Sequence, residues 1–121
     1  MIADRLLTVL GCLFGAVGIG LMALAAHGRW PDINYAAIMV LAHAPALIAI
    51  VAALRAGLLH ALLARPAAFL LAAAVALFSA DVALNAMTGQ RLFPMAAPIG
   101  GTSSMAAWLL VGVSALVSKT R

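Results

Sequence analysis

Residues 77–101 read LFSADVALNAMTGQRLFPMAAPIGG, and this stretch decides the fold because it ends one apolar run and begins the next. A carboxylate, Asp81, lies inside the first run, and prolines and glycines follow it closely. An acidic group in a bilayer costs roughly 2.5–3.5 kcal/mol even on the mildest insertion scale. The stretch therefore predicts a membrane-spanning helix whose carboxylate needs a partner, followed by a turn-rich connection.

The composition of the whole chain indicates an integral membrane protein. Of its 121 residues, 67% are hydrophobic and only 8% are charged. Soluble domains carry about 25% charged residues. A water-soluble fold of this length could not bury so much apolar surface.

Four apolar segments are each close to the roughly 20 residues that a bilayer-spanning helix needs. They cover residues 6–26, 36–54, 67–88 and 102–118. Pro66 suits the first turn of the third helix, and Thr102 or Ser103 could cap the fourth. We predict an all-α polytopic membrane protein: a single domain over residues 1–121, with four transmembrane helices in a compact antiparallel bundle.

The basic residues predict the orientation of the four spans, because cytoplasmic connections are enriched in Lys and Arg. The N-terminal segment, the second connection and the C-terminal segment hold five of them: Arg5, Arg55, Arg65, Lys119 and Arg121. The first and third connections hold only Arg29 and Arg91. Both termini are therefore expected in the cytoplasm. A cleaved signal peptide ending near Ala25 is the alternative, but the first apolar run is longer than such segments usually are.

Small residues on the first helix predict close helix packing. Gly11 and Gly15 form one pair four residues apart, and Ala16 and Gly20 form another, which lets helix backbones approach closely. Packing within the chain is the simpler interpretation. The alternative is a homo-oligomer or a membrane-protein partner bound through the Gly11/Gly15 face.

Polar residues at similar depth predict a cluster inside the bundle. His43 and Asp81 each lie seven residues from the outer ends of their predicted spans, about 10 Å below the boundary at 1.5 Å per residue. Asn85 shares a helix face with Asp81, and His27 closes the first span on the same side. Two interpretations stay open. His43 and Asp81 either lock the helices together, which we favour, or form a proton-responsive pair.

The connection that follows Asp81 is expected to cap the outer side of the bundle. It carries Arg91, Pro94, Pro98, Gly100 and Gly101, with little other charge. It should lie in the interface or dip back where protein covers its backbone. Two glycines before a helix could also expose N–H groups to an anion, although the rest of a phosphate-loop pattern is missing.

Several classes of function find no support in the sequence. The net charge is +4, but the basic residues are scattered singly, so nucleic-acid binding is not expected. With one cysteine and no paired histidines at ligand spacing, we expect no metal or other cofactor. No Gly-x-Ser-x-Gly pattern or carboxylate dyad indicates an enzyme. We expect an accessory or interaction protein in the lipid bilayer, or alternatively a small proton- or cation-coupled transporter or channel that uses the His–Asp pair.

Several motifs together resemble a known family. They are Ala26-His27-Gly28, the single His43, the LFSAD run that ends at Asp81, and residues 89–101 followed by Trp108. The chain resembles the domain-of-unknown-function 423 family (UPF0382 group) of small bacterial inner-membrane proteins. The resemblance implies a four-helix membrane protein and implies no activity. The first connection is short, and Ala44-Pro45 after His43 departs from the family pattern.

Overall fold

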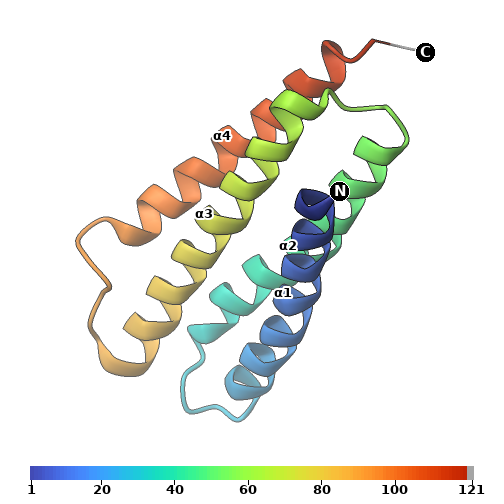
Figure 1. Ribbon diagram of the computed structural model, residues 1–121. Helices are drawn as coiled ribbons and strands as arrows, with labels where there is room; N and C mark the ends of the chain where they lie inside the picture. Colours follow the sequence, from blue (N-terminus) through green and yellow to red (C-terminus); the bar gives the residue numbers. More distant parts are fainter. Residues whose placement is uncertain (120–121) are drawn as a thin grey trace.

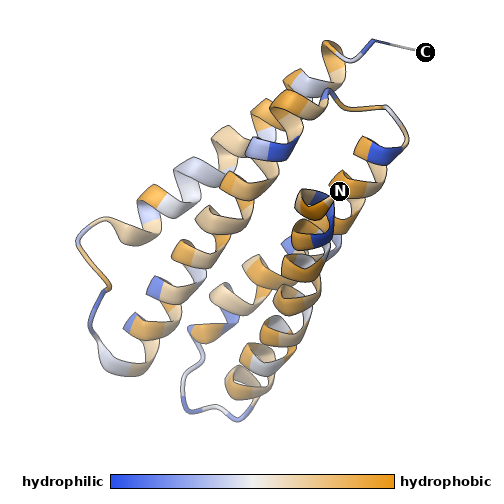
Figure 2. Cartoon of the chain, viewed as in Figure 1, coloured by the Kyte–Doolittle hydropathy of each residue, from blue (hydrophilic) through white to orange (hydrophobic). Residues whose placement is uncertain are grey.

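The computed structural model describes residues 1–119 and contains four α-helices (Figure 1). Their bounds are α1 (Ile2–Ala26), α2 (Ile33–Arg55), α3 (Ala61–Thr88) and α4 (Ala96–Leu116). All four are long and apolar enough to cross a membrane. Polar residues gather near the helix ends, and the middle of each helix is mostly hydrophobic (Figure 2). The chain is a multi-pass membrane protein, as its composition predicts.

The helices pack in the order in which they occur along the chain. α1 packs on α2, α2 on α3, and α3 on α4, whereas α1 touches α3 only lightly. Successive helices run antiparallel as two hairpins that meet along α2 and α3 (Figure 1). The buried core lies mainly on these two helices, and Leu47, Leu71 and Val75 are fully buried in it. One end of the bundle carries both termini and the α2–α3 connection, and the opposite end carries the other two connections.

All four helices begin earlier than the sequence suggested, and α1 begins at Ile2 rather than 6. α2 begins at Ile33 rather than 36, α3 at Ala61 rather than 67, and α4 at Ala96 rather than 102. Pro66 lies in the second turn of α3, where its missing N–H leaves only the carbonyl of Leu62 near the helix end unpaired. Pro98 is the third residue of α4, where no N–H is lost. Prolines near these starts are therefore inside the helices, and do not mark their first residues.

Close packing of α3 and α4 depends on a glycine. A Cβ atom on Gly100 would lie 2.8 Å from both the carbonyl oxygen of Ala74 and the backbone nitrogen of Phe78. Gly11 has the same role in α1, since a Cβ there would lie 2.9 Å from the carbonyl oxygen of Ala44 in α2. Packing within the chain, the simpler of the two sequence interpretations, therefore accounts for Gly11.

Candidate functional site

Asp81 lies in α3 and is bound by the connection that follows its own helix. Arg91 donates from Nη1 to Oδ2 at 2.9 Å, and the backbone N–H of Leu92 donates to Oδ1 at 2.9 Å. Asp81 is fully buried, whereas the Arg91 side chain is 51% exposed. We call Asp81, Arg91 and Leu92 the Asp81 clasp. Arg91 supplies the countercharge, and Arg91 and Leu92 each donate one hydrogen bond to the Asp81 carboxylate inside the bundle.

Local sequence positions Arg91 to reach back to Asp81. Gly89 adopts a left-handed conformation with φ 71° at the C-terminus of α3, and its N–H donates to the carbonyl of Asn85 at 2.8 Å. A residue without a Cβ enters this conformation without strain. The Thr88 hydroxyl then accepts a hydrogen bond from the N–H of Gln90 at 3.2 Å. These two contacts reverse the chain so that residues 91 and 92 lie over the carboxylate.

His43 forms its hydrogen bonds with Met39 and Trp108 rather than with Asp81. Its Nδ1 lies 2.7 Å from the carbonyl oxygen of Met39 and donates to it, which leaves Nε2 as the acceptor for the indole N–H of Trp108 at 3.1 Å. The two rings are tilted by 48° with centroids 5.9 Å apart. The hydrogen bond from Trp108 to His43 links α2 to α4 within the membrane. In a neutral His43 this bond occupies Nε2 and the bond to Met39 occupies Nδ1, so both ring nitrogens have a partner.

The predicted polar cluster is therefore divided. Among the described residues, no hydrogen bond or ion pair joins His43 to Asp81, so the pairing inferred from their depth is wrong. Asp81 instead takes its partners from the connection. His27 is exposed at the end of α1, and Asn85 is partly buried with no side-chain hydrogen bond to the described part of the chain.

The predicted outer cap is also divided. Arg91 and Pro94 lie in the connection, whereas Pro98, Gly100 and Gly101 belong to α4. Gly100 and Gly101 are the fifth and sixth residues of that helix, so their N–H groups form its own hydrogen bonds. They are not available to an anion, and the role of Gly100 is contact with α3.

A second buried carboxylate, Asp4, was not singled out from the sequence. Its Oδ1 accepts from Nε of Arg65 at 2.8 Å, and its Oδ2 lies 3.1 Å from Nε of Arg55. Only 2% of the Asp4 side chain is exposed, against 24% for Arg65 and 60% for Arg55. The three residues join α1, α2 and α3 at the end that carries both termini. One acid and two arginines on the same predicted side would have been the signal.

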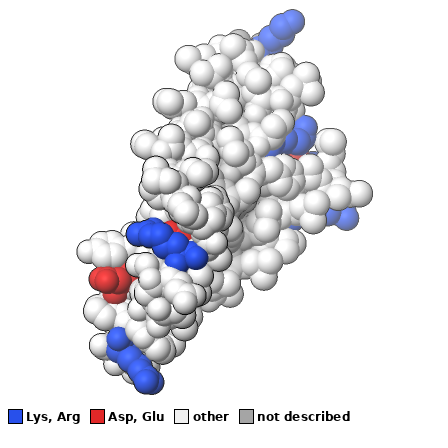
Figure 3. Space-filling model, turned by 90° about the vertical axis from the view of Figure 1, so that its left-hand side faces the viewer, with Lys and Arg blue, Asp and Glu red and all other residues white. Residues whose placement is uncertain are grey.

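Charged side chains therefore lie near the two ends of the bundle. On the face shown in Figure 3, an uncharged stretch of surface separates the Lys, Arg and Asp side chains of one end from those of the other. Each buried carboxylate is matched by arginine from the same chain. In the described residues, no group of three His, Cys, Asp or Glu side chains could hold a metal ion. The arrangement is suited to holding helices together.

Asp4→Asn should lower the melting temperature of the protein in micelles more than Arg55→Gln does. Asparagine removes the countercharge of both arginines, whereas Arg55 is largely exposed and exposed ion pairs contribute little. Thermal unfolding followed by circular dichroism measures both variants. Equal melting temperatures for the two would show that the buried position of Asp4 does not matter.

Trp108→Phe and His43→Phe should each cost less than about 1 kcal/mol of unfolding free energy, because hydrogen bonds between transmembrane helices average about 0.6 kcal/mol. The double variant should cost less than the two single changes together, since each removes the same bond. Unfolding in mixed micelles of detergent and dodecyl sulfate measures the unfolding free energies of the parent protein, the two single variants and the double variant. Strict additivity would mean that the 3.1 Å contact contributes nothing.

These features define a class: a four-helix, multi-pass membrane protein whose buried acids are bound by its own arginines. The family model described as "Protein of unknown function (DUF423)" matches residues 14–101. The chain belongs to this family, as its motifs suggested. The match includes the Asp81 clasp, His43 and Gly100, whereas Asp4 and Trp108 lie outside it. No curated protein and no solved structure is significantly similar to the chain.

Proposed function

We propose that this protein is a non-enzymatic accessory or interaction protein of the bacterial inner membrane. The observation that carries the proposal is that both buried carboxylates are occupied by arginines of the same chain. A proton or cation carrier needs a carboxylate that exchanges its partner during transport. Asp4 and Asp81 instead form permanent ion pairs that stabilise the two opposite ends of the bundle.

The outward side of α1 is the surface proposed to meet a partner. Its buried side faces α2, whereas Ala16 and Gly20 are exposed, and a Cβ on Gly20 would have no neighbour within 4 Å. Small exposed residues let another membrane helix approach closely. Since α2 covers Gly11, a homo-oligomer or membrane-protein partner on this side of α1 would use the exposed edge formed by Ala16 and Gly20, beside the half-buried Gly15.

The proposed orientation places both termini in the cytoplasm. Arg5, Arg55, Arg65 and Lys119 lie at the end that carries the termini, and Arg29 and Arg91 lie at the opposite end. Arg121, which the sequence count also used, lies outside the described residues. Since positive charge favours the cytoplasmic side, this distribution supports the proposed orientation.

A small proton- or cation-coupled transporter or channel is the second candidate. One observation favours it: Asp81 is a fully buried ionisable residue in a transmembrane helix, and such residues often have a function. The Arg91 contact weighs against it, because the guanidinium already occupies the carboxylate. Measurement of proton and cation flux through the protein in liposomes separates the two candidates.

Crosslinking in living cells tests the accessory role. A photoreactive amino acid at Ile19 on α1, which is 67% exposed, should give a discrete protein adduct. The matched control is Leu109 on α4, which is 72% exposed and should give lipid adducts only. An adduct of twice the chain mass would identify a second copy as the partner. The same adduct pattern at both positions would contradict a specific partner surface on α1.

A further inference from the structure

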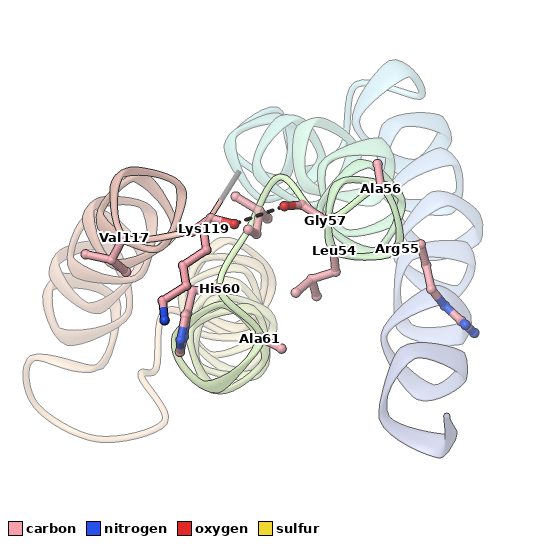
Figure 4. A pocket seen from close by; sticks show the side chains of 10 residues that line it. Leu54, Arg55, Ala56, Gly57, His60, Ala61, Val117 and Lys119 are labelled. Atoms are coloured by element: carbon pink, nitrogen blue, oxygen red, sulfur yellow. Dashed lines mark hydrogen bonds between the residues drawn. The ribbon is translucent and has the colours of Figure 1, made fainter. Parts of the chain in front are cut away.

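A cavity of about 630 Å³ lies at the end of the bundle that carries both termini. The C-terminus of α2, the α2–α3 connection, the start of α3 and the residues after α4 form its walls (Figure 4). Ser118 closes one side, because its hydroxyl donates to the carbonyl oxygen of Gly57 at 2.9 Å. Segments that are distant in sequence are therefore fastened together around this space.

The cavity has a one-sided charge. Lys119 and His60 line it, and their side chains extend in the same direction in Figure 4. Arg55 also belongs to the lining, but its side chain points away toward α1, where Nε meets Asp4 at 3.1 Å. None of the lining residues is acidic. Among the described residues, an anion in the cavity would therefore meet donors and no side-chain carboxylate.

His60 lines this cavity and has one ring nitrogen without a hydrogen-bond partner among the described residues. Its Nδ1 is buried and has no hydrogen-bond partner among the described residues, although a buried polar atom without one is costly. As the Nδ1–H tautomer, the imidazole could donate to a ligand oxygen. A rotation of the ring that brings Nδ1 to the cavity would let an acceptor there satisfy this atom.

The adjoining helix ends differ in what they still need. The carbonyl groups of Ala53 and Leu54 near the end of α2 are already bound, because the N–H groups of Leu58 and Gly57 donate to them. In contrast, α3 has no side-chain cap and no acidic residue in its first turn. The N–H of Ala61, which lines the cavity, has no backbone acceptor within residues 1–119. The first N–H of α3 is thus a further donor without an acceptor, in addition to His60 and Lys119.

Exposed apolar side chains that are next in sequence to lining residues indicate the source of the anion. Leu116 is 85% exposed and Leu62 is 81% exposed, and each adjoins a lining residue, Val117 or Ala61. Side chains of this kind at the end of a transmembrane bundle lie against acyl chains. A phospholipid could place its phosphate in the cavity and its acyl chains on these two leucines, whereas a free phosphate would use only the polar half.

We propose that this cavity binds the phosphate group of an anionic phospholipid. Lys119 provides the charge, His60 provides a hydrogen bond from Nδ1, and the first N–H of α3 provides a second donor. The protein would thus select anionic lipid at the end of the bundle that carries both termini. The proposal does not depend on the accessory role, because a transporter or an adaptor could use such a lipid equally.

Native mass spectrometry of the whole protein, released from nanodiscs of phosphatidylcholine with a minority of phosphatidylglycerol, tests the proposal. One phosphatidylglycerol per chain should be retained in preference to phosphatidylcholine. Lys119→Gln should lower this preference about fivefold, the value of one basic side chain near an anionic surface. His60→Ala should lower the preference for phosphatidylglycerol by more than Lys119→Gln does. Arg5→Gln is the matched control, because Arg5 lies at the same end but does not line the cavity.

Each outcome decides the proposal. Equal losses for Arg5→Gln and Lys119→Gln would assign the preference to general charge and overturn the site, as would no preference in the parent protein. Inorganic phosphate is added separately to protein in neutral detergent. A rise in melting temperature that Lys119→Gln abolishes would assign the cavity to a free anion and overturn the lipid source. Since Lys119 is exposed and follows the last helix, this variant should fold even if His60→Ala does not.

Discussion

Asp81→Asn should lower the free energy of unfolding by about 2 kcal/mol. The neutral amide can still accept from the N–H of Leu92, but it no longer balances the charge of Arg91. Breaking a fully buried ion pair costs about 3–5 kcal/mol, and the smaller value here reflects an Arg91 side chain that is 51% exposed. Titration with dodecyl sulfate in mixed micelles, followed by circular dichroism, measures the change.

Asp32→Asn is the matched control for this variant. Asp32 lies at the same end of the bundle, is exposed, and forms no capping hydrogen bond with its side chain. Its replacement should leave stability nearly unchanged. The double variant Asp81→Asn with Arg91→Gln should recover part of the loss, because the unbalanced guanidinium is gone. If Asp32→Asn and Asp81→Asn had equal effects, the Asp81 clasp would not stabilise the bundle.

Gly100→Ala should cost about 2 kcal/mol, because adding volume to a well-packed contact costs about 1–3 kcal/mol. Its new Cβ would lie 2.8 Å from the carbonyl oxygen of Ala74 and the backbone nitrogen of Phe78. Both are backbone atoms, so no side chain can rotate away and α3 must separate from α4. The same titration measures the loss.

The neighbouring Gly101→Ala is an unusually close control. Its Cβ would lie 3.8 Å from a ring carbon of Phe78, which is an ordinary contact. Alanine also favours a helix over glycine. We therefore expect no loss of stability, or a small gain. A loss at residue 101 as large as that at residue 100 would contradict the packing account of the α3–α4 contact.

The sequence predicted the four membrane helices correctly because long apolar runs in a small chain have no other stable arrangement. It placed all four helix starts too late. Pro66 and Gly100-Gly101 looked like boundaries, since proline and glycine usually interrupt helices. In the structure both lie inside helices: Pro66 leaves only a carbonyl near the helix end unpaired, and Gly100 is needed for contact with α3.

The sequence predicted that Asp81 needs a partner, but it did not identify that partner. A depth count compares residues in straight helices, so it favoured His43. The real partner, Arg91, lies in an irregular connection whose path depends on the left-handed Gly89 and the hydrogen bonds around Thr88. Asp4 was missed for a related reason. Its two arginines were counted as orientation signals, and nothing local shows that they also turn toward a carboxylate on α1.

The central claim is that the buried carboxylates hold the helices together and do not carry protons or cations. Flux through the purified protein in liposomes tests this claim. A pH-sensitive dye and a potassium-sensitive dye inside the vesicles report proton and cation entry in the parent protein and in Asp81→Asn. The account predicts that both proteins give the flux of empty liposomes, and that the variant differs only in its lower stability. A pH-dependent flux in the parent that Asp81→Asn abolishes, while the variant remains folded and inserted, would contradict it.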